Sequence, residues 1–402
     1  SSDQTKSNTK SNESEKPAPM KKSLSSQIIQ FNTEPDEGWP KLSHFYTVGR
    51  MIGEGAFGKV YKATDKKSGK IVALKIVQKA LLDSKDNPAS AYEKLRQEVI
   101  ILESIDHEAL LKLEALIETR SKIVLVSELL DGPTLFESVV EKQARCEPFT
   151  EQHASQIVAQ LLHALDYLSE SKIIHRDLKP ENIMFTSKTL EQVKIIDFGL
   201  GKIFSDLDGR VSSAAFTSTL CGSPMYVAPE LLETALRGDD PLDDDQHVYF
   251  AGKLDIWSVG VICFMTLSGC CPFYHDDIAK MYKQILSSDY SYDDEYWADI
   301  SDEAMTFIDR ILQARDPKKR PSARQLLQDP WIVSPPKQRK DIASSKNKLV
   351  DRLTEIEKRS SRFSSAETND YSSTDGDDSY HQSQYFNDSD FDSSSFIDSS
   401  QD

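Results

Sequence analysis

Between residues 45 and 130 the chain carries short stretches with the patterns of β-strands. Residues 45–52 and 59–64 flank a glycine-rich turn, and 59–64 alternates apolar and polar positions. Residues 71–75 and 123–130 are apolar runs, which are typical of strands buried on both faces. The pattern therefore predicts a small sheet in the first third of the chain.

Helical spacing appears from residue 91 onward. Leu95, Val99 and Leu102 recur every three or four positions and predict a helix over 91–105. A second helix is predicted over 150–171, with Thr150 as its N-cap. The apolar run 256–265 is shorter than the roughly 18 residues that a spanning helix needs, so we expect a buried core helix and no membrane contact.

Two short apolar runs are each followed by a polar loop. Residues 172–174 precede His-Arg-Asp-Leu-Lys-Pro-Glu-Asn (175–182), and residues 193–196 precede Asp-Phe-Gly (197–199). Catalytic groups are often displayed on loops that follow strands. The loops supply Asp177, Lys179, Asn182 and Asp197, a set that suits phosphoryl transfer, in which negative charge is neutralised and a hydroxyl is deprotonated.

The glycines at 53, 55 and 58 have G-x-G-x-x-G spacing. This spacing also occurs in dinucleotide-binding domains, where it opens a helix. Here a strand pattern follows, so we predict a hairpin whose backbone amides can approach phosphate oxygens. The next strand ends at Lys75, in Val-Ala-Leu-Lys.

With these motifs the sequence resembles the eukaryotic protein kinases, and the Leu-Lys-Pro-Glu-Asn form is similar to the serine/threonine kinases. Within them it most resembles the calcium/calmodulin-dependent group. The resemblance implies an α+β bilobal fold, with a small, mostly β N-lobe that carries one key helix, a larger, mostly α C-lobe and disordered ends. It also implies transfer of the γ-phosphate of ATP to Ser or Thr hydroxyls of proteins.

The resemblance gives each catalytic residue a role. Asp177 would accept the hydroxyl proton and Lys179 would neutralise the γ-phosphate. Asn182 and Asp197 would hold Mg²⁺. Lys75 would bind the α- and β-phosphates, with Glu98 as its partner; Glu93 and Glu103 are alternatives that the sequence context does not favour.

By the same resemblance ATP lies under the hairpin and against the end of the last strand. Ser127 would be a small gatekeeper, and Thr134 stands where basophilic relatives often have Glu. The expected nucleotide-binding residues are Ile52, Gly53, Glu54, Gly55, Ala56, Phe57, Gly58, Lys59, Val60, Ala73 and Lys75, with the Glu128 carbonyl and the Leu130 amide for adenine.

The segment from Gly201 to Leu220 is small and polar and reads as a loop that ends at Ala-Pro-Glu (228–230). Arg176 precedes the expected catalytic base, and kinases with this arginine are commonly switched by a phosphate on this loop. Thr219 matches the spacing of that phosphosite best, which implies an upstream activating kinase. A loop that is already ordered is the alternative.

Composition divides the chain of 402 residues into a core and polar ends. We expect a disordered extension at 1–44, a kinase domain at 45–332 (N-lobe 45–130, C-lobe 131–332), a basic extension at 333–363 and an acidic tail at 364–402. The tail holds ten Asp or Glu and no Lys or Arg, and so contributes −10 to a net charge of −17. An acidic chain of pI about 5.0 is not expected to bind nucleic acid.

Three smaller features complete the picture. The acidic stretch at 237–252 lacks the glycine and glutamate of a calcium loop and is expected to be an exposed insertion. Residues 337–363 are basic with a short amphipathic face, but they lack Trp, so we favour a generic helical or disordered extension over a calmodulin site. Five scattered cysteines without a Cys-x-x-Cys pair suit a reducing compartment, the cytoplasm or the nucleus.

Three other readings compete. One is an interaction protein whose ends do the work while the kinase is secondary, and the sequence does not exclude such partners. A pseudokinase that only binds nucleotide predicts a missing Lys, Asp or Asn, but Lys75, Asp177 and Asn182 are present. A small-molecule kinase is disfavoured by the complete segment that ends at Ala-Pro-Glu.

Overall fold

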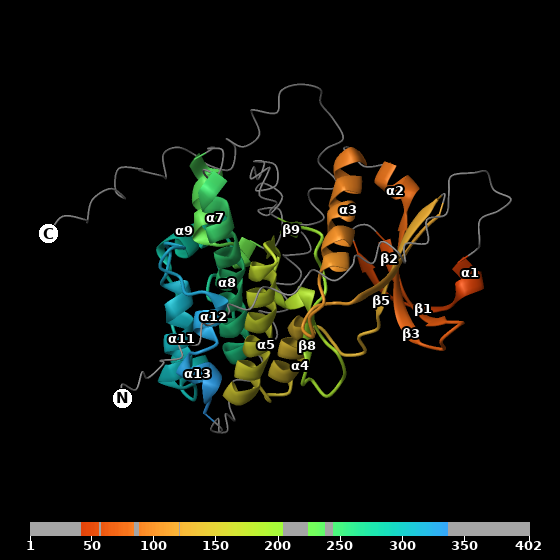
Figure 1. The fold of residues 1–402 in the computed structure, drawn as a ribbon. Helices are drawn as coiled ribbons and strands as arrows, with labels where there is room; N and C mark the ends of the chain where they lie inside the picture. The colour runs from red at the N-terminus through yellow and green to blue at the C-terminus, as the bar shows by residue number, and fades with distance from the viewer. Residues whose placement is uncertain are drawn as a thin grey trace, which may run out of the picture.

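The computed structural model describes residues 42–55, 58–83, 88–119, 121–203, 224–237 and 244–336. These residues form two lobes of unequal size, with the sheet in the smaller lobe and most helices in the larger one (Figure 1). Of the expected segments, 1–41, the 238–243 part of the acidic insertion and everything from 337 onward lie outside the described residues.

The small lobe is built on one five-stranded antiparallel sheet with the order β1-β2-β3-β5-β4. The four stretches predicted as strands are all present, and the structure adds the edge strand β4. The strands are β1 (Tyr46–Gly55), β2 (Gly58–Asp65), β3 (Ile71–Gln78), β4 (Leu113–Glu118) and β5 (Lys122–Glu128).

Helices cover both faces of this sheet. α1 (Leu42–Phe45) packs with Leu42 and Phe45 against a small cluster around Tyr46 and Leu74 on one face. The described residues therefore include α1, which lies before the boundary that we expected at residue 45. The other helices of the lobe are α2 (Lys79–Asp83) and α3 (Pro88–Ser104).

Helix α3 lies between the sheet and the larger lobe (Figure 1). It begins three residues before the predicted start and ends one residue before the predicted end. Leu95, Glu98 and Leu102 lie one turn apart, and all three are buried, which fits a helix with one inward face. A buried carboxylate such as that of Glu98 needs a polar partner, so this face of the helix does more than pack against apolar residues.

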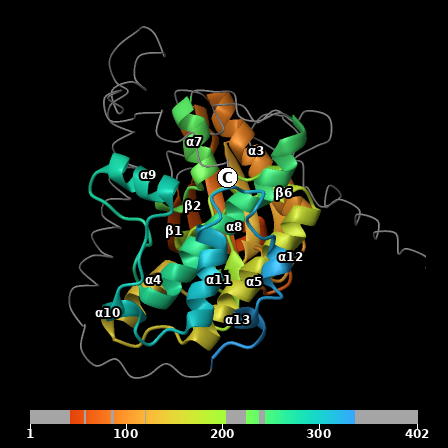
Figure 2. The same cartoon turned by 90° about the vertical axis from the view of Figure 1, so that its left-hand side faces the viewer.

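The larger lobe packs around α5 and α8, with α11 against α8 (Figure 2). The run 256–265 lies within α8 and is buried throughout, as predicted for a core helix. Residues 244–252, which belong to the expected exposed insertion, form the start of α8. The helices are α4 (Leu135–Ala144), α5 (Glu151–Glu170), α7 (Pro229–Arg237), α8 (Asp244–Ser268), α9 (Ile278–Ser287), α10 (Asp294–Trp297), α11 (Asp302–Leu312), α12 (Ala323–Leu326) and α13 (Pro330–Val333).

Short strands at the junction of the lobes carry the polar loops. β6 (Ile173–Ile174) pairs with β9 (Lys202–Ile203), and β7 (Ile183–Phe185) pairs with β8 (Val193–Ile195), each antiparallel. Strand β9 corrects the prediction of a continuous loop from Gly201 to Leu220. Single turns of 3-10 helix follow at η2 (Pro180–Asn182) and η3 (Pro224–Tyr226).

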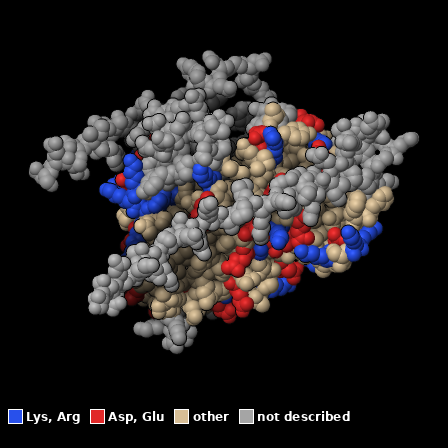
Figure 3. Space-filling model, in the orientation of Figure 1, with Lys and Arg blue, Asp and Glu red and all other residues tan. Residues whose placement is uncertain are grey.

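The surface drawn in Figure 3 is strongly charged, and acidic side chains gather near the junction of the lobes with basic ones among them. Within the described segments, no helix has the length and apolar character needed to cross a bilayer.

Candidate active site

The glycine-rich segment is a hairpin, as its strand pattern predicted. Gly53 pairs with Val60, Glu54 with Lys59 and Gly55 with Gly58 across β1 and β2. A Cβ on Gly58 would stand 2.3 Å from the carbonyl oxygen of Ile76 on β3, so only glycine fits at this position. Ala56 and Phe57, at the tip, lie outside the described residues.

The expected adenine site lies between this hairpin and the end of β5. Ile52 is 41% exposed, whereas Ala73 and Leu130 are each 8% exposed. The hydroxyl of Ser127, the expected small gatekeeper, donates to the Glu128 carbonyl at 3.3 Å. This is the carbonyl that was expected to accept a hydrogen bond from adenine. The Glu128 carboxylate points away from that carbonyl to other partners, the amide of Lys112 and the ammonium of Lys194.

Lys75 and Glu98 form an ion pair between β3 and α3. The Lys75 ammonium lies 2.7 Å from Glu98 Oε1, and neither Glu93 nor Glu103 is its partner. Burial lowers the pKa of Lys75, but the charges of Glu98 and Asp197 outweigh it and raise the pKa above its ordinary value. The ammonium is therefore fully charged at neutral pH, in the state that suits phosphate binding.

The loop after β6 brings the other polar groups together. Asp177 Oδ2 lies 3.1 Å from the Lys179 ammonium. The Asn182 side-chain amide donates to Asp177 Oδ2 at 3.0 Å and to the Asp177 carbonyl at 2.8 Å. The ammonium of Lys179 and the side-chain amide of Asn182 thus both contact the Asp177 carboxylate.

A buried carboxylate from α8 fixes the backbone of this loop. Asp255 accepts hydrogen bonds from the amides of His175, at 2.9 Å, and Arg176, at 2.8 Å. Arg176 has a φ of 65°, in the left-handed region that non-glycine residues seldom adopt. The two bonds to Asp255 hold the loop in this conformation, directly before Asp177.

The Arg176 side chain is half-buried, and its donors are only partly satisfied. Its Nε donates to the Leu200 carbonyl at 2.7 Å, while Nη1 has no hydrogen-bond partner among the described residues. Burial lowers the pKa of Arg176 to about 10, and nearby Asp255 offsets only part of that effect. A half-buried cation with an unused donor is a suitable partner for an anion.

Asp197 is held at the other end of the site. Its Oδ1 accepts from the Gly199 amide at 2.8 Å. Phe198 is fully buried and meets the His175 ring edge to face at 4.9 Å. A Cβ on Gly201 would stand 2.8 Å from the Ile101 side chain of α3, so this segment is packed closely against the helix that carries Glu98.

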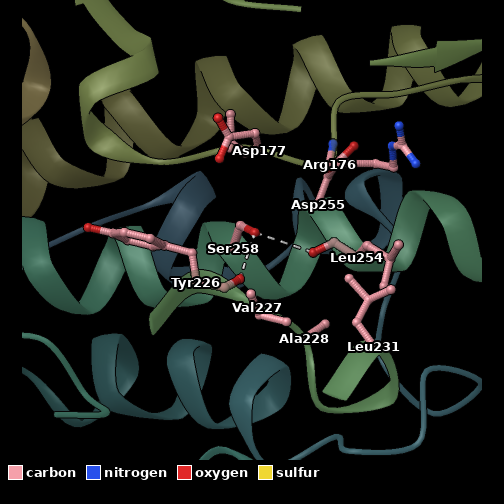
Figure 4. A pocket seen from close by; sticks show the side chains of 10 residues that line it. Arg176, Asp177, Tyr226, Val227, Ala228, Leu231, Leu254, Asp255 and Ser258 are labelled. Carbon is pink, nitrogen blue, oxygen red and sulfur yellow. Dashed lines mark hydrogen bonds between the residues drawn. The ribbon is translucent and has the colours of Figure 1, made fainter. Parts of the chain in front are cut away.

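The end of the Ala-Pro-Glu segment is anchored in the large lobe. Arg320 binds the Glu230 carboxylate with two bonds, of 2.7 and 2.9 Å. A small pocket lies between the catalytic loop and Tyr226–Ala228 (Figure 4). Ser258, which also lines this pocket, donates to the Tyr226 carbonyl at 3.2 Å. Thr219 lies outside the described residues.

The donor set fits a magnesium ion. Both hydrogen bonds of the Asn182 side-chain nitrogen go to Asp177, so the amide oxygen is the atom that remains for a cation. Carboxylate and amide oxygens are the hard ligands that Mg²⁺ prefers, completed by phosphate and water. Over the described segments no group of three or more His, Cys, Asp or Glu side chains could hold a metal ion.

Sequence reasoning missed two contributors. Asp255 directly fixes the backbone of the two residues before Asp177, although it lies about 80 residues away from them in the sequence. Lys194 was not singled out, because its partner Glu128 lies 66 residues away and no local pattern connects them.

Comparisons with known proteins agree with this geometry. The family model described as "Protein kinase domain" matches residues 46–332. A probable myosin light chain kinase of Dictyostelium discoideum is 38% identical over 288 residues, 72% of this chain and 83% of the relative. Myosin light chain kinase A of the same organism is 36% identical, covering 73% and 90%. Calcium/calmodulin-dependent protein kinase type 1B of Rattus norvegicus is 34% identical, covering 77% and 82%.

Both the family match and the relatives cover most of the chain, and the site contains the Lys–Glu pair and the catalytic loop of that family. The chain belongs to the protein kinase family, as an ATP- and Mg²⁺-dependent serine/threonine protein kinase of the calcium/calmodulin-dependent group.

Proposed function

We propose that Asp177 accepts the proton of the substrate hydroxyl, that Lys179 neutralises the γ-phosphate, and that Lys75, held by Glu98, binds the α- and β-phosphates. One observation carries this assignment: Asp177 Oδ2 contacts both the Lys179 ammonium and the Asn182 amide. The proposed base Asp177 is thus in direct contact with the cation Lys179 and with Asn182, the expected metal ligand. Phosphoryl transfer uses such groups held close together.

We also assign the proton transfer to one oxygen of the Asp177 carboxylate. Both contacts of the Asp177 side chain use Oδ2, so Oδ1 is the oxygen that we assign to the hydroxyl proton. Mg²⁺, held by Asn182 and Asp197, would supply charge neutralisation on the phosphate oxygens. Catalysis then consists of positioning and charge stabilisation by groups that are already in place.

The test of this proposal is transfer of radiolabelled γ-phosphate from ATP to a library of Ser- and Thr-containing peptides. Label should appear on Ser and Thr, disappear with a chelator and return when Mg²⁺ is added. Nucleotide binding without any transfer would instead support the pseudokinase reading.

For substrate preference, we propose a mild selection for arginine upstream of the acceptor. Glu181 is retained, but Thr134 replaces the second carboxylate and instead caps α4, where it bonds to Glu137. A single exposed opposite charge typically contributes about 1 kcal/mol or less. A positional array would overturn this if it showed acidic or proline-directed preference, and it should include a myosin light chain peptide because two relatives carry that name.

For activation, we propose that an upstream kinase phosphorylates Thr219 and that Arg176 binds the phosphate. The support is the buried Nη1 donor of Arg176, which has no hydrogen-bond partner among the described residues. A phosphate adds a charge of about −1.5 to −2 and can form one to three charge-assisted bonds. Equal turnover by the wild type, the phosphatase-treated enzyme and Thr219→Ala would exclude this switch.

The remaining partners and the location are also proposals. Calmodulin binding at 337–363 is our less favoured candidate, supported by the name of a relative and tested by adding calcium and calmodulin to the full chain. We propose a cytoplasmic location, with the nucleus as the alternative, because scattered thiols suit a reducing compartment. Imaging of the tagged full-length chain tests this.

A further inference from the structure

The junction of the lobes contains an ion pair that the catalytic roles do not use. Lys194, on β8 of the large lobe, places its ammonium 2.7 Å from Glu128 Oε1 at the end of β5. The same ammonium donates to the carbonyl of Leu110 at 3.1 Å. The side chains of Lys194 and Glu128 are only 12% and 24% exposed.

Glu128 is held from several directions at once. Its carboxylate also accepts from the backbone amide of Lys112 at 2.8 Å. Its own amide donates to the Lys112 carbonyl at 3.1 Å. Lys194 supplies the only contact among these that comes from the large lobe, so it fixes Glu128 relative to that lobe.

The pair is not needed to keep the lobes together. Two backbone hydrogen bonds join the same loop to β8: the Leu111 amide to the Ile195 carbonyl at 3.0 Å, and the Ile195 amide to the Ala109 carbonyl at 2.9 Å. Loss of the Lys194 ammonium leaves both of them intact. Its distinct effect is therefore on the side chain of Glu128, whose backbone begins the connection between the lobes.

We propose that Lys194 is a positioning residue for ATP: it holds Glu128 so that the backbone after β5 keeps the geometry that receives adenine. This rests on the proposed role of the Glu128 carbonyl and the Leu130 amide. The pair is formed in the same structure as Lys75–Glu98, so it belongs to the assembled state of the site. Limited exposure to water strengthens such a pair relative to one on the open surface.

The experiment compares Lys194→Met with a matched control, Lys79→Met. Lys79 forms an ion pair of 2.6 Å with Glu118, and the Lys79 side chain is 23% exposed, but both partners lie in the small lobe. For Lys194→Met we expect the Kd of Mg·ATP, measured by direct titration, and the KM for ATP to rise about tenfold. The kcat at saturating ATP should stay within about twofold, and the control should match the wild type in all three quantities.

A second variant separates positioning from loss of folding. Glu128→Gln keeps an acceptor for the Lys112 amide and removes the charge, so we expect an increase in Kd of about threefold, and less than additive effects with Lys194→Met. Unchanged ATP affinity in both variants, or additive effects, would overturn the proposal. The titration needs no transfer activity, so it gives this result even if the proposed catalytic roles fail.

Discussion

Two ion pairs of this kinase have similar chemistry and different surroundings. Lys75–Glu98 joins β3 to α3 at the cleft, and Glu230–Arg320 joins the end of the Ala-Pro-Glu segment to the large lobe. Arg320 is fully buried, binds Glu230 twice and also donates to the carbonyls of Lys253 and Ala314. The hydrogen bonding found for the Lys75 ammonium within the described residues goes to Glu98 alone.

The difference separates a structural pair from a functional one. The guanidinium of Arg320 has its donors satisfied by protein, so it can add little to a ligand. The Lys75 side chain is 24% exposed and keeps donors for a phosphate, while Glu98, 3% exposed, holds it in position. Unused hydrogen-bonding capacity, rather than charge, thus marks the residue that acts on the substrate.

Lys75→Met is the strongest test of the distinction between the two ion pairs. We expect phosphate transfer to fall about 10³-fold, or about 4 kcal/mol in activation free energy, because the phosphates lose a fixed cation. Unfolding free energy should fall by less than about 2 kcal/mol, because the Lys75 side chain is 24% exposed and, among the described residues, its ammonium has a single hydrogen bond to protein to lose, the one to Glu98. Steady-state kinetics and urea unfolding measure the two quantities, and a stability loss as large as the activity loss would contradict the distinction.

Arg320→Met should show the reverse pattern. Removing one partner of a buried pair leaves Glu230 uncompensated and typically costs about 3–5 kcal/mol of stability. We expect a lower urea midpoint, while the molecules that remain folded keep the KM for ATP of the wild type. Wild-type stability would show that this pair is dispensable.

Glu98→Gln should have a smaller effect. The amide keeps an oxygen that can accept from Lys75 but loses the charge, so we expect about a tenfold decrease in kcat/KM. Glu93→Gln is the matched control, because Glu93 is exposed and makes no contact with Lys75. Equal decreases in both variants would mean that charge in α3, rather than the pair, matters.

The smallest effect concerns pH. Because the pKa of Lys75 is raised, its contribution to stability is fully present below the ordinary lysine pKa and is lost only as pH rises through the higher folded value. The stability difference between wild type and Lys75→Met should therefore be constant from about pH 7 to about pH 9. A difference that changes within this range would show that Lys75 titrates earlier.

The sequence predicted most of the fold because its elements are locally encoded. Period-two and period-3.6 patterns located the strands and the long helices, and the apolar run in α8 identified the core helix. Boundaries were less certain: α1 and the first turn of α3 lack strong apolar periodicity, and β9 is a two-residue strand that exists only through pairing with β6.

The candidate site was predictable where residues lie in one motif or where a resemblance connected two motifs. Lys75–Glu98 was found in this way. The pair of Lys194 and Glu128 and the two bonds from Asp255 were not, because each joins residues that are far apart in sequence and carry no local signal. Such contacts depend on tertiary packing, which periodicity does not encode.

The most direct test of the account is Asp177→Asn, with ATP binding and phosphate transfer measured on the same preparation. The proposed base touches the substrate hydroxyl and not the nucleotide, so transfer should fall by about 10²–10⁴-fold. The Kd of Mg·ATP should stay within about threefold of the wild-type value. Turnover close to the wild-type rate would contradict the account, because it would remove Asp177 from the chemistry.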